Sequence, residues 1–116
     1  MMDDFNFRDG DALAKGTPME ISKRPRFKIY KGSTALKHPT RKEQRYSQER
    51  QKLITSGILV DHPSIADLLL FTCEYEANSA SMAAGVICGG GNFSGPEKWF
   101  ESHSGEAFNE WLKKRL

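Results

Sequence analysis

The sequence predicts an α+β domain in which a small antiparallel sheet is packed by two to three helices. Residues 26–31 alternate between apolar and polar side chains, which is the pattern of a half-buried strand. Two further apolar runs, at 58–60 and 68–72, have the length of strands and are expected to pair antiparallel. Segments at 41–56 and 80–88 carry the capping residues and composition of helices.

Residues 1–25 are expected to form a poorly ordered, flexible N-terminal arm, and residues 26–116 a single α+β domain. Gly10, Gly16 and Pro18 interrupt the apolar pattern of the arm. Because glycine and proline are the strongest breakers of regular structure, we expect little secondary structure before the first strand.

The first expected strand places Phe27 and Ile29 on one side and Lys28 on the other. The pair Gly32-Ser33 then indicates a turn or a bulge, since glycine permits backbone conformations that other residues avoid. A short return strand is expected at Ala35-Leu36.

Two helices are predicted from the residues that typically begin and end a helix. Thr40 is expected to cap the helix at 41–56, and Gly57 stands just after its end. Asn78 or Ser79 is expected to cap the helix at 80–88, which a run of glycines terminates. The second helix is rich in small side chains, which allow close approach to a sheet.

In the C-terminal part of the chain, the residue pattern predicts a strand at 97–101 and a helix at 106–116. The strand contains the adjacent aromatic residues Trp99 and Phe100. Because neighbouring residues in a strand face opposite sides, one of these rings is expected in the core. The other is expected to stack on a base or on a protein partner.

Composition limits the class of protein. The chain has 116 residues, 28% of them charged and 38% hydrophobic, with a formal net charge of +2. This fits one soluble domain, and no apolar run approaches the roughly 20 residues that cross a bilayer. The acidic start lacks the apolar segment of a secretory signal, so we expect a cytoplasmic location with Cys73 and Cys88 as free thiols. Cys73 is expected to be buried in a strand.

The charge is distributed unevenly along the chain. Residues 23–52 have a balance of +9, whereas residues 1–22 have −3 and residues 53–116 have −4. A basic segment of this kind attracts phosphate backbones or acidic protein surfaces. The alternative is an ordinary solvated face that the acidic C-terminal half partly neutralises.

Within this segment, Arg41, Arg45, Gln48 and Lys52 follow one another at helical spacings. Three cations and an amide on one stripe suit phosphates and an adenine edge, although solvated helices often carry such stripes. Two hydroxyls at Ser79 and Ser81 would make an anion site at a helix start, or would only cap the helix. The candidate nucleic-acid-binding residues are Lys28, Lys31, Arg41, Arg45, Gln48, Lys52, Ser79, Ser81 and Trp99.

Other chemistry receives no support from the sequence. The cysteines and histidines lack the spacing of metal ligands, so we expect no metal and no other cofactor. The glycine-rich run 89–95 follows a helix rather than preceding one, unlike a phosphate-binding loop. No combination of residues has the form of a catalytic site, so we expect the protein not to be an enzyme.

Five segments in order resemble a small bacterial family, the domain of unknown function 4357. The similarity extends over about residues 27–102. This sequence has Ala80, Met82 and Ser94 where the family has proline, alanine and asparagine. The similar segments are residues 27–35, 50–59, 70–75, 79–84 and 94–99.

The resemblance implies an accessory, non-catalytic module in DNA metabolism. Members of this family occur with GIY-YIG nucleases and with restriction-modification proteins, and they resemble the RAMA domains proposed to sense modified DNA. We therefore expect a nucleic-acid-binding accessory module with DNA as its ligand. The alternative is a protein-interaction or inhibitor module whose basic face docks an acidic partner. We expect neither a membrane nor a small-molecule substrate as a partner.

Overall fold

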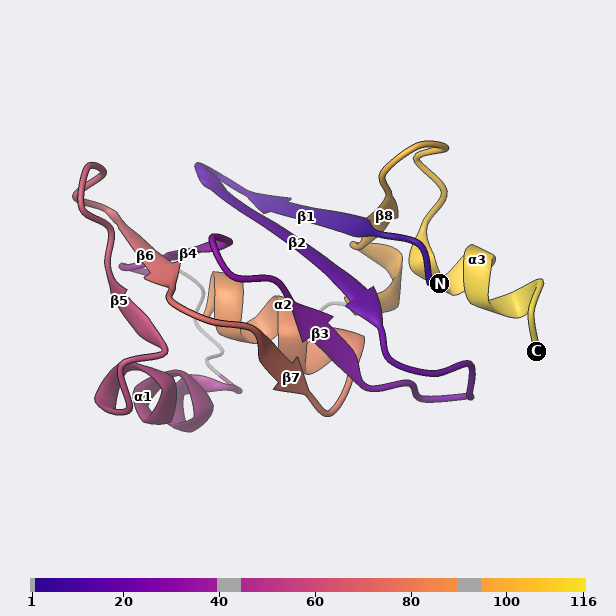
Figure 1. Ribbon diagram of the computed structural model, residues 1–116, viewed down its shortest axis with the longest axis horizontal. Helices are drawn as coiled ribbons and strands as arrows, with labels where there is room; N and C mark the ends of the chain where they lie inside the picture. The colour runs from indigo at the N-terminus through magenta and orange to yellow at the C-terminus, as the bar shows by residue number, and fades with distance from the viewer. Residues whose placement is uncertain (1, 40–44, 90–94) are drawn as a thin grey trace.

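Two antiparallel sheets and three α-helices make up the described part of the chain, which confirms the predicted α+β class (Figure 1). The computed structural model describes residues 2–39, 45–89 and 95–116. The strands are β1 (Phe5–Asp9), β2 (Ala12–Pro18), β3 (Phe27–Ile29), β4 (Thr34–Leu36), β5 (Leu59–Asp61), β6 (Leu68–Phe71), β7 (Tyr75–Ala77) and β8 (Phe100–Glu101). The helices are α1 (Ser47–Thr55), α2 (Ala80–Cys88) and α3 (Phe108–Lys113), with a 3-10 turn, η1, at Gly95–Glu97.

The larger sheet has the strand order β7-β3-β2-β1-β8, and all its neighbouring strands are antiparallel. Side chains along its strands alternate between the buried and the exposed face, as in a half-buried sheet. Phe5 and Phe7 of β1 and Phe27 and Ile29 of β3 lie in the interior. Helix α2 packs across this buried face, and no described helix lies over the opposite face (Figure 1). The small side chains of α2 permit this close packing.

The smaller sheet has the order β4-β6-β5, and its β5–β6 pair confirms the antiparallel strands expected there. The short strand at β4 pairs with β6 rather than returning along β3. The turn before it explains this path. Gly32 has a φ of 92° and donates its N–H to the carbonyl of Phe71, and Phe71 donates back to Ser33. These bonds direct the chain onto β6.

The prediction of a flexible N-terminal arm is wrong. Residues 5–9 and 12–18 form β1 and β2, a hairpin whose innermost pair is Asp9 with Ala12. Gly10 and Asp11 make its two-residue loop, and Gly10 has a φ of 57°, which glycine adopts without strain. The hairpin supplies two of the five strands of the larger sheet, so it is part of the domain.

The other supposed breakers have structural roles in the same hairpin. A Cβ at position 16 would lie 2.3 Å from the backbone oxygen of Lys28, so Gly16 is needed for β2 to approach β3. Pro18 is the last residue of β2 and is buried. After it, the chain is held by a bond from the Met19 N–H to the carbonyl of Arg26 (2.9 Å).

An aromatic cluster joins the N-terminal strand to the C-terminal helix. The ring of Phe5 lies 5.1 Å from that of Phe108 and 5.2 Å from that of Trp111, both edge-on. Phe27 lies 4.4 Å from Trp99 and 5.5 Å from Phe108. Edge-to-face pairs such as Phe5 with Phe108 add stability beyond the area they bury.

The helices match their predicted positions to different degrees. Helix α2 has the predicted bounds, with Ser79 as its N-cap and Gly89 as its C-cap. Helix α1 begins at Ser47, and the predicted cap Thr40 lies outside the described residues. Helix α3 is shorter than expected at both ends, because Ala107 before it is still extended and Lys114 is already its C-cap. None of the helices in the described ranges is long and apolar enough to cross a membrane.

Two expectations about short elements need correction. The strand expected at 97–101 is reduced to Phe100–Glu101, because η1 occupies the preceding residues. Cys73 is exposed rather than buried, since it follows β6 in the bend that leads to β7. Cys88, at the end of α2, is buried.

Substituting Phe5 tests whether the hairpin is part of the core. Phe5→Ala should lower the free energy of unfolding by about 3–5 kcal/mol, the usual cost of removing a buried phenyl ring. Leu13→Ala, on the same hairpin but 47% exposed, serves as the control. Its cost should stay within about 0.5 kcal/mol. Urea unfolding followed by circular dichroism measures both, and equal costs would contradict the packing of β1.

Candidate functional site

Helix α1 presents the polar stripe that the sequence predicts. Arg45 lies just before the helix, and Gln48 and Lys52 lie on it, all three exposed. Gln48 and Lys52 also line a shallow hollow on the outer surface of α1. Arg41 lies outside the described residues. The structure therefore places Gln48 and Lys52 on one solvent-facing side of α1, with Arg45 exposed just before the helix.

The opposite side of α1 is fixed by a buried arginine. Arg50 donates to the carbonyl of Val86 on α2 and to the carbonyl of Leu36 on β4, each over 2.6 Å. Because Val86 is in the last turn of α2, the guanidinium also meets the negative end of that helix dipole. Burial lowers the pKa of Arg50 from its ordinary value. Arg50 thus holds α1 with the polar stripe outward and is not itself available to a ligand.

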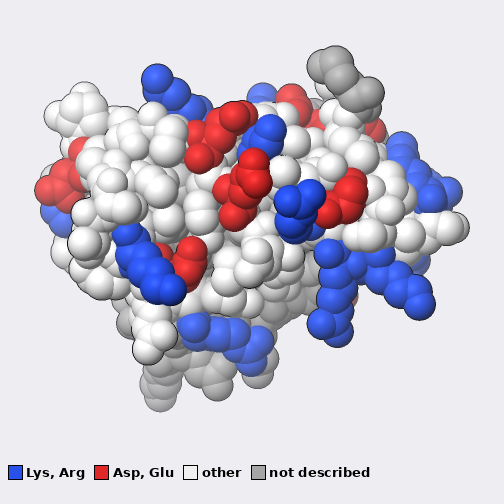
Figure 2. All heavy atoms as spheres, turned by 60° about the horizontal axis from the view of Figure 1, so that its bottom comes forward, with Lys and Arg blue, Asp and Glu red and all other residues white. Residues whose placement is uncertain are grey.

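Acidic partners neutralise part of the basic segment. Arg26 pairs with Glu20 (2.9 Å), Lys37 with Asp61 (3.0 Å) and Lys28 with Glu74 (3.9 Å). Figure 2 shows Lys and Arg interspersed with Asp and Glu over the face that it presents, rather than a continuous basic surface. The balance of +9 in the sequence therefore overstates the positive charge of the folded segment.

The start of α2 uses its two serines for structure. The Ser79 hydroxyl accepts the N–H of Met82 (3.0 Å), which confirms its capping role. The Ser81 hydroxyl accepts the N–H of Gly95 (3.1 Å) and so connects α2 to η1. Binding of an anion at this turn stays a prediction, and each of the two hydroxyls already accepts a backbone donor.

Trp99 is not part of a surface site. Its indole is fully buried, and its Nε1 donates to the carbonyl of Ala80 (3.1 Å). Gly95 fits against the same turn, since a Cβ there would lie 2.3 Å from the Cα of Ser81. The Ser-x-Ser and Gly-x-x-x-Trp segments of the sequence are therefore two halves of one packing contact. Of the adjacent aromatics, Phe100 is the exposed one, at 44%.

Sequence reasoning missed a second group of exposed residues, on the helix-free face of the larger sheet. Asn6 and Arg8 of β1 and Leu13 and Lys15 of β2 all point away from α2, because the residues that alternate with them are buried. Phe100 of β8 lies beside Asn6. The period-two pattern of residues 5–8 and 12–16 was the signal, but the glycines around it favoured the interpretation as an arm.

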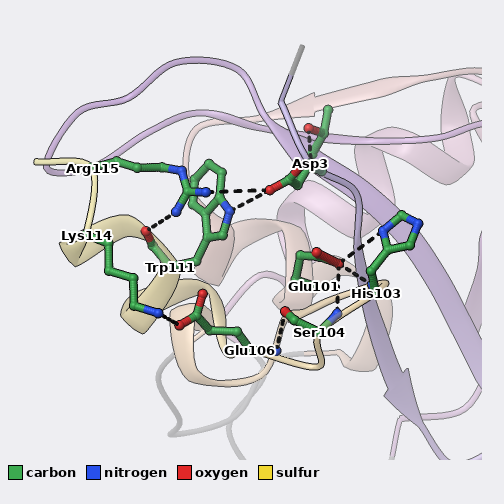
Figure 3. A network of polar contacts seen from close by, with 9 residues as sticks. Asp3, Glu101, His103, Ser104, Glu106, Trp111, Lys114 and Arg115 are labelled. Carbon is green, nitrogen blue, oxygen red and sulfur yellow. Dashed lines mark hydrogen bonds and ion pairs between the residues drawn. The ribbon is translucent and has the colours of Figure 1, made fainter.

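A network of polar contacts holds β8 and the loop after it (Figure 3). The carboxylate of Glu101 accepts the backbone N–H of His103 and that of Ser104. The Ser104 hydroxyl accepts the N–H of Glu106 (3.2 Å), whose carbonyl accepts the N–H of Glu101 (2.8 Å). These hydrogen bonds hold the loop after β8 in a fixed conformation. Phe100 is thereby kept at the sheet edge with its ring outward.

The same region connects the two ends of the chain. The Nε1 of Trp111 donates to the carboxylate of Asp3 (2.8 Å), and Arg115 lies 3.7 Å from the same oxygen. The Arg115 guanidinium also stacks 3.9 Å from the centroid of the Trp111 ring (Figure 3). This contact fixes α3 beside β1 and stabilises the edge that carries β8.

The sequence-predicted site residues thus lie on three separate elements. Gln48 and Lys52 are on α1, with Arg45 just before it. Lys28 and Lys31 are on β3 and the turn after it. The two serines and Trp99 surround the start of α2. Lys31 is exposed, while Lys28 is half-buried beside Glu74.

The turn at α2 generates a stability prediction. Ser79→Ala should cost about 0.5–2 kcal/mol, because the cap of α2 loses its hydroxyl acceptor. Gly95→Ala should cost more, because its new methyl group meets backbone atoms of Ser81 that cannot move without displacing α2. Ser81→Ala, which removes only the bond to Gly95, is the control. Thermal and urea unfolding of the three variants measure the order, and a harmless Gly95→Ala would contradict the close contact.

Tyr30 generates a pH prediction. Burial, together with a hydrogen bond to the Asp4 carboxylate (2.6 Å), raises the pKa of Tyr30 to about 12 from an ordinary value of 10.0. A proton bound more tightly in the folded state stabilises the fold below pH 10, and this stabilisation is lost between pH 10 and about 12. Tyr30→Phe should therefore flatten the decline of the unfolding free energy with pH in that window. Ultraviolet titration of tyrosinate checks the assignment, and an unshifted Tyr30 would contradict it.

Comparison with known proteins identifies the family. The search of curated proteins and the search of solved structures found no match. The family model described as a domain of unknown function (DUF4357) matches residues 5–112. This range includes the β1–β2 hairpin and most of α3, so it extends the sequence resemblance at both ends. Because it covers nearly the whole chain, the protein belongs to the DUF4357 family of domains of unknown function.

Proposed function

We propose that the protein is a non-catalytic accessory module that binds DNA through the outer side of α1. The observation that supports this function is the exposed stripe of Arg45, Gln48 and Lys52, which has no carboxylate of the described residues within ion-pair distance. Arg50 on the opposite side keeps the helix in place.

The spacing of the stripe suits a nucleic-acid backbone. The cations of the stripe are Lys52 on α1 and Arg45, which lies just before the helix. Phosphates recur every 3.4 Å or so along one strand of DNA, so the two cations reach separate phosphates. Gln48 lies between them and has the donor and acceptor that pair with adenine in the major groove.

The biological setting of the proposal comes from the sequence resemblance. Association with GIY-YIG nucleases and restriction-modification systems would make the domain a targeting module that keeps a partner enzyme on DNA. In that role the domain needs affinity for the backbone and no reaction of its own.

One observation favours a second candidate, a protein-interaction module. The paired charges Lys28–Glu74, Arg26–Glu20 and Lys37–Asp61 give the basic segment a mixed surface. A pattern of both signs complements another protein better than it complements a uniformly negative backbone.

A double substitution tests the DNA proposal. Arg45→Glu with Lys52→Glu should weaken binding of duplex DNA and should lower the slope of log affinity against log salt by about 2, or about 0.9 for each lost phosphate contact. Lys113→Glu, an exposed cation on α3, is the matched control. Fluorescence anisotropy across a salt series measures the slope, and circular dichroism confirms folding. Unchanged DNA affinity in the double variant would exclude the stripe.

A further inference from the structure

The helix-free face of the larger sheet carries one continuous row of side chains. Asn6 stands between Phe100 and Lys15 in the strand register, and Lys15 accepts the N–H of Tyr30 at its carbonyl (2.8 Å). The row therefore crosses four neighbouring segments in the order Phe100, Asn6, Lys15, Tyr30. At about 4.8 Å between strands, it spans about 14 Å. An aromatic ring stands at each end, with an amide and a cation between them.

Apolar surface is exposed in this row, at Phe100, and beside it, at Leu13, which lies opposite Arg8. Phe100 is 44% and Leu13 47% exposed, although both are large hydrophobic residues. Leu13 and Asn6 line two adjoining hollows, one shared with Arg8 and Phe100 and the other with Lys15 and Tyr30. The two hollows form a shallow groove across the strands. Flat apolar rings in an open groove are the surface on which unstacked bases bind.

Three cations around this groove have no ion-pair partner among the residues that the structure describes. Arg8, Lys15 and Lys31 are exposed, and no carboxylate in residues 2–39, 45–89 and 95–116 lies within 4.0 Å of them as an ion pair. Lys28, one row away on the same face, is paired with Glu74. The carboxylate of Asp4 accepts the hydroxyl of Tyr30 at one end of the row (2.6 Å). Because Arg8, Lys15 and Lys31 themselves have no ion-pair partner among the described residues, their charge favours a polyanion as the occupant.

We propose that this face binds single-stranded nucleic acid, with Phe100 and Tyr30 stacking on bases and Arg8, Lys15 and Lys31 contacting phosphates. A duplex does not fit this chemistry, because its base faces are stacked inside the helix. The proposal shares with the proposed function only the class of ligand. It concerns a different surface and a different form of nucleic acid.

The test compares single-stranded and duplex DNA of equal length, both labelled, by fluorescence anisotropy with the full chain at low salt. The wild type should bind oligo(dT), and the sheet-face variants should weaken this binding more than they weaken binding of the duplex. Phe100→Ala should weaken this binding by about five-fold to a hundredfold, the range for losing one base–aromatic contact. Phe100→Trp should retain it. Ile65→Ala is the matched control, because Ile65 is equally exposed, at 45%, in the loop between β5 and β6.

The cations are tested by salt dependence. Lys15→Gln with Arg8→Gln should lower the slope of log affinity against log salt by about 0.7 for each contact with a single strand. Lys113→Gln should leave the slope unchanged. Oligo(rU) in place of oligo(dT) distinguishes RNA from DNA as the preferred strand. Far-ultraviolet circular dichroism shows that each variant is folded.

Several results would overturn the inference. They are an unaltered affinity for oligo(dT) in folded Phe100→Ala, or displacement of oligo(dT) by an equal charge concentration of polyglutamate, which would indicate a general acidic partner. If only the α1 variants weaken binding, the proposed function stands and the sheet-face inference fails. If only the sheet-face variants do so, the inference stands and the α1 proposal fails.

Discussion

The burial of Trp99 is the constraint on which the rest of the structure depends. Its ring lies 4.4 Å from that of Phe27 and 5.4 Å from that of Phe7, so it closes the interior of the larger sheet. A buried indole N–H needs an acceptor, and it finds the carbonyl of Ala80 at the start of α2. One side chain thereby fixes the larger sheet relative to the first turn of α2, against which Gly95 of η1 also packs. Phe100, the residue after Trp99, begins β8, and its ring points to the outer face of the sheet.

The parts of the fold that could be predicted are those with local signals. Helix α2 has a hydroxyl cap and a left-handed glycine at its two ends, so its bounds follow from the sequence. The β5–β6 pair follows from two short apolar runs. The β1–β2 hairpin was missed because its glycines act over long range. Gly16 permits contact with β3, which lies ten or more residues later, and a local breaker rule cannot detect this.

The candidate site was predictable only where exposure follows from helical spacing. Arg45, Gln48 and Lys52 are exposed as expected. Arg50, from the same basic segment, is buried between two carbonyls, and its sequence neighbours gave no sign of this. The ion pairs of the segment connect it to residues far along the chain, as in Lys37 with Asp61 and Lys28 with Glu74. Charge in a sequence window therefore differs from charge on the folded surface.

The clamp between Asp3 and the pair Trp111 and Arg115 has a mechanical consequence. The chain enters and leaves the domain at one corner, where the carboxylate of Asp3 touches both C-terminal side chains (Figure 1). A domain with adjacent ends can be inserted into a loop of a larger host without separating the segments that flank it. Tension between those segments would fall first on this clamp, and the aromatic interior behind it would carry load only after the clamp had opened.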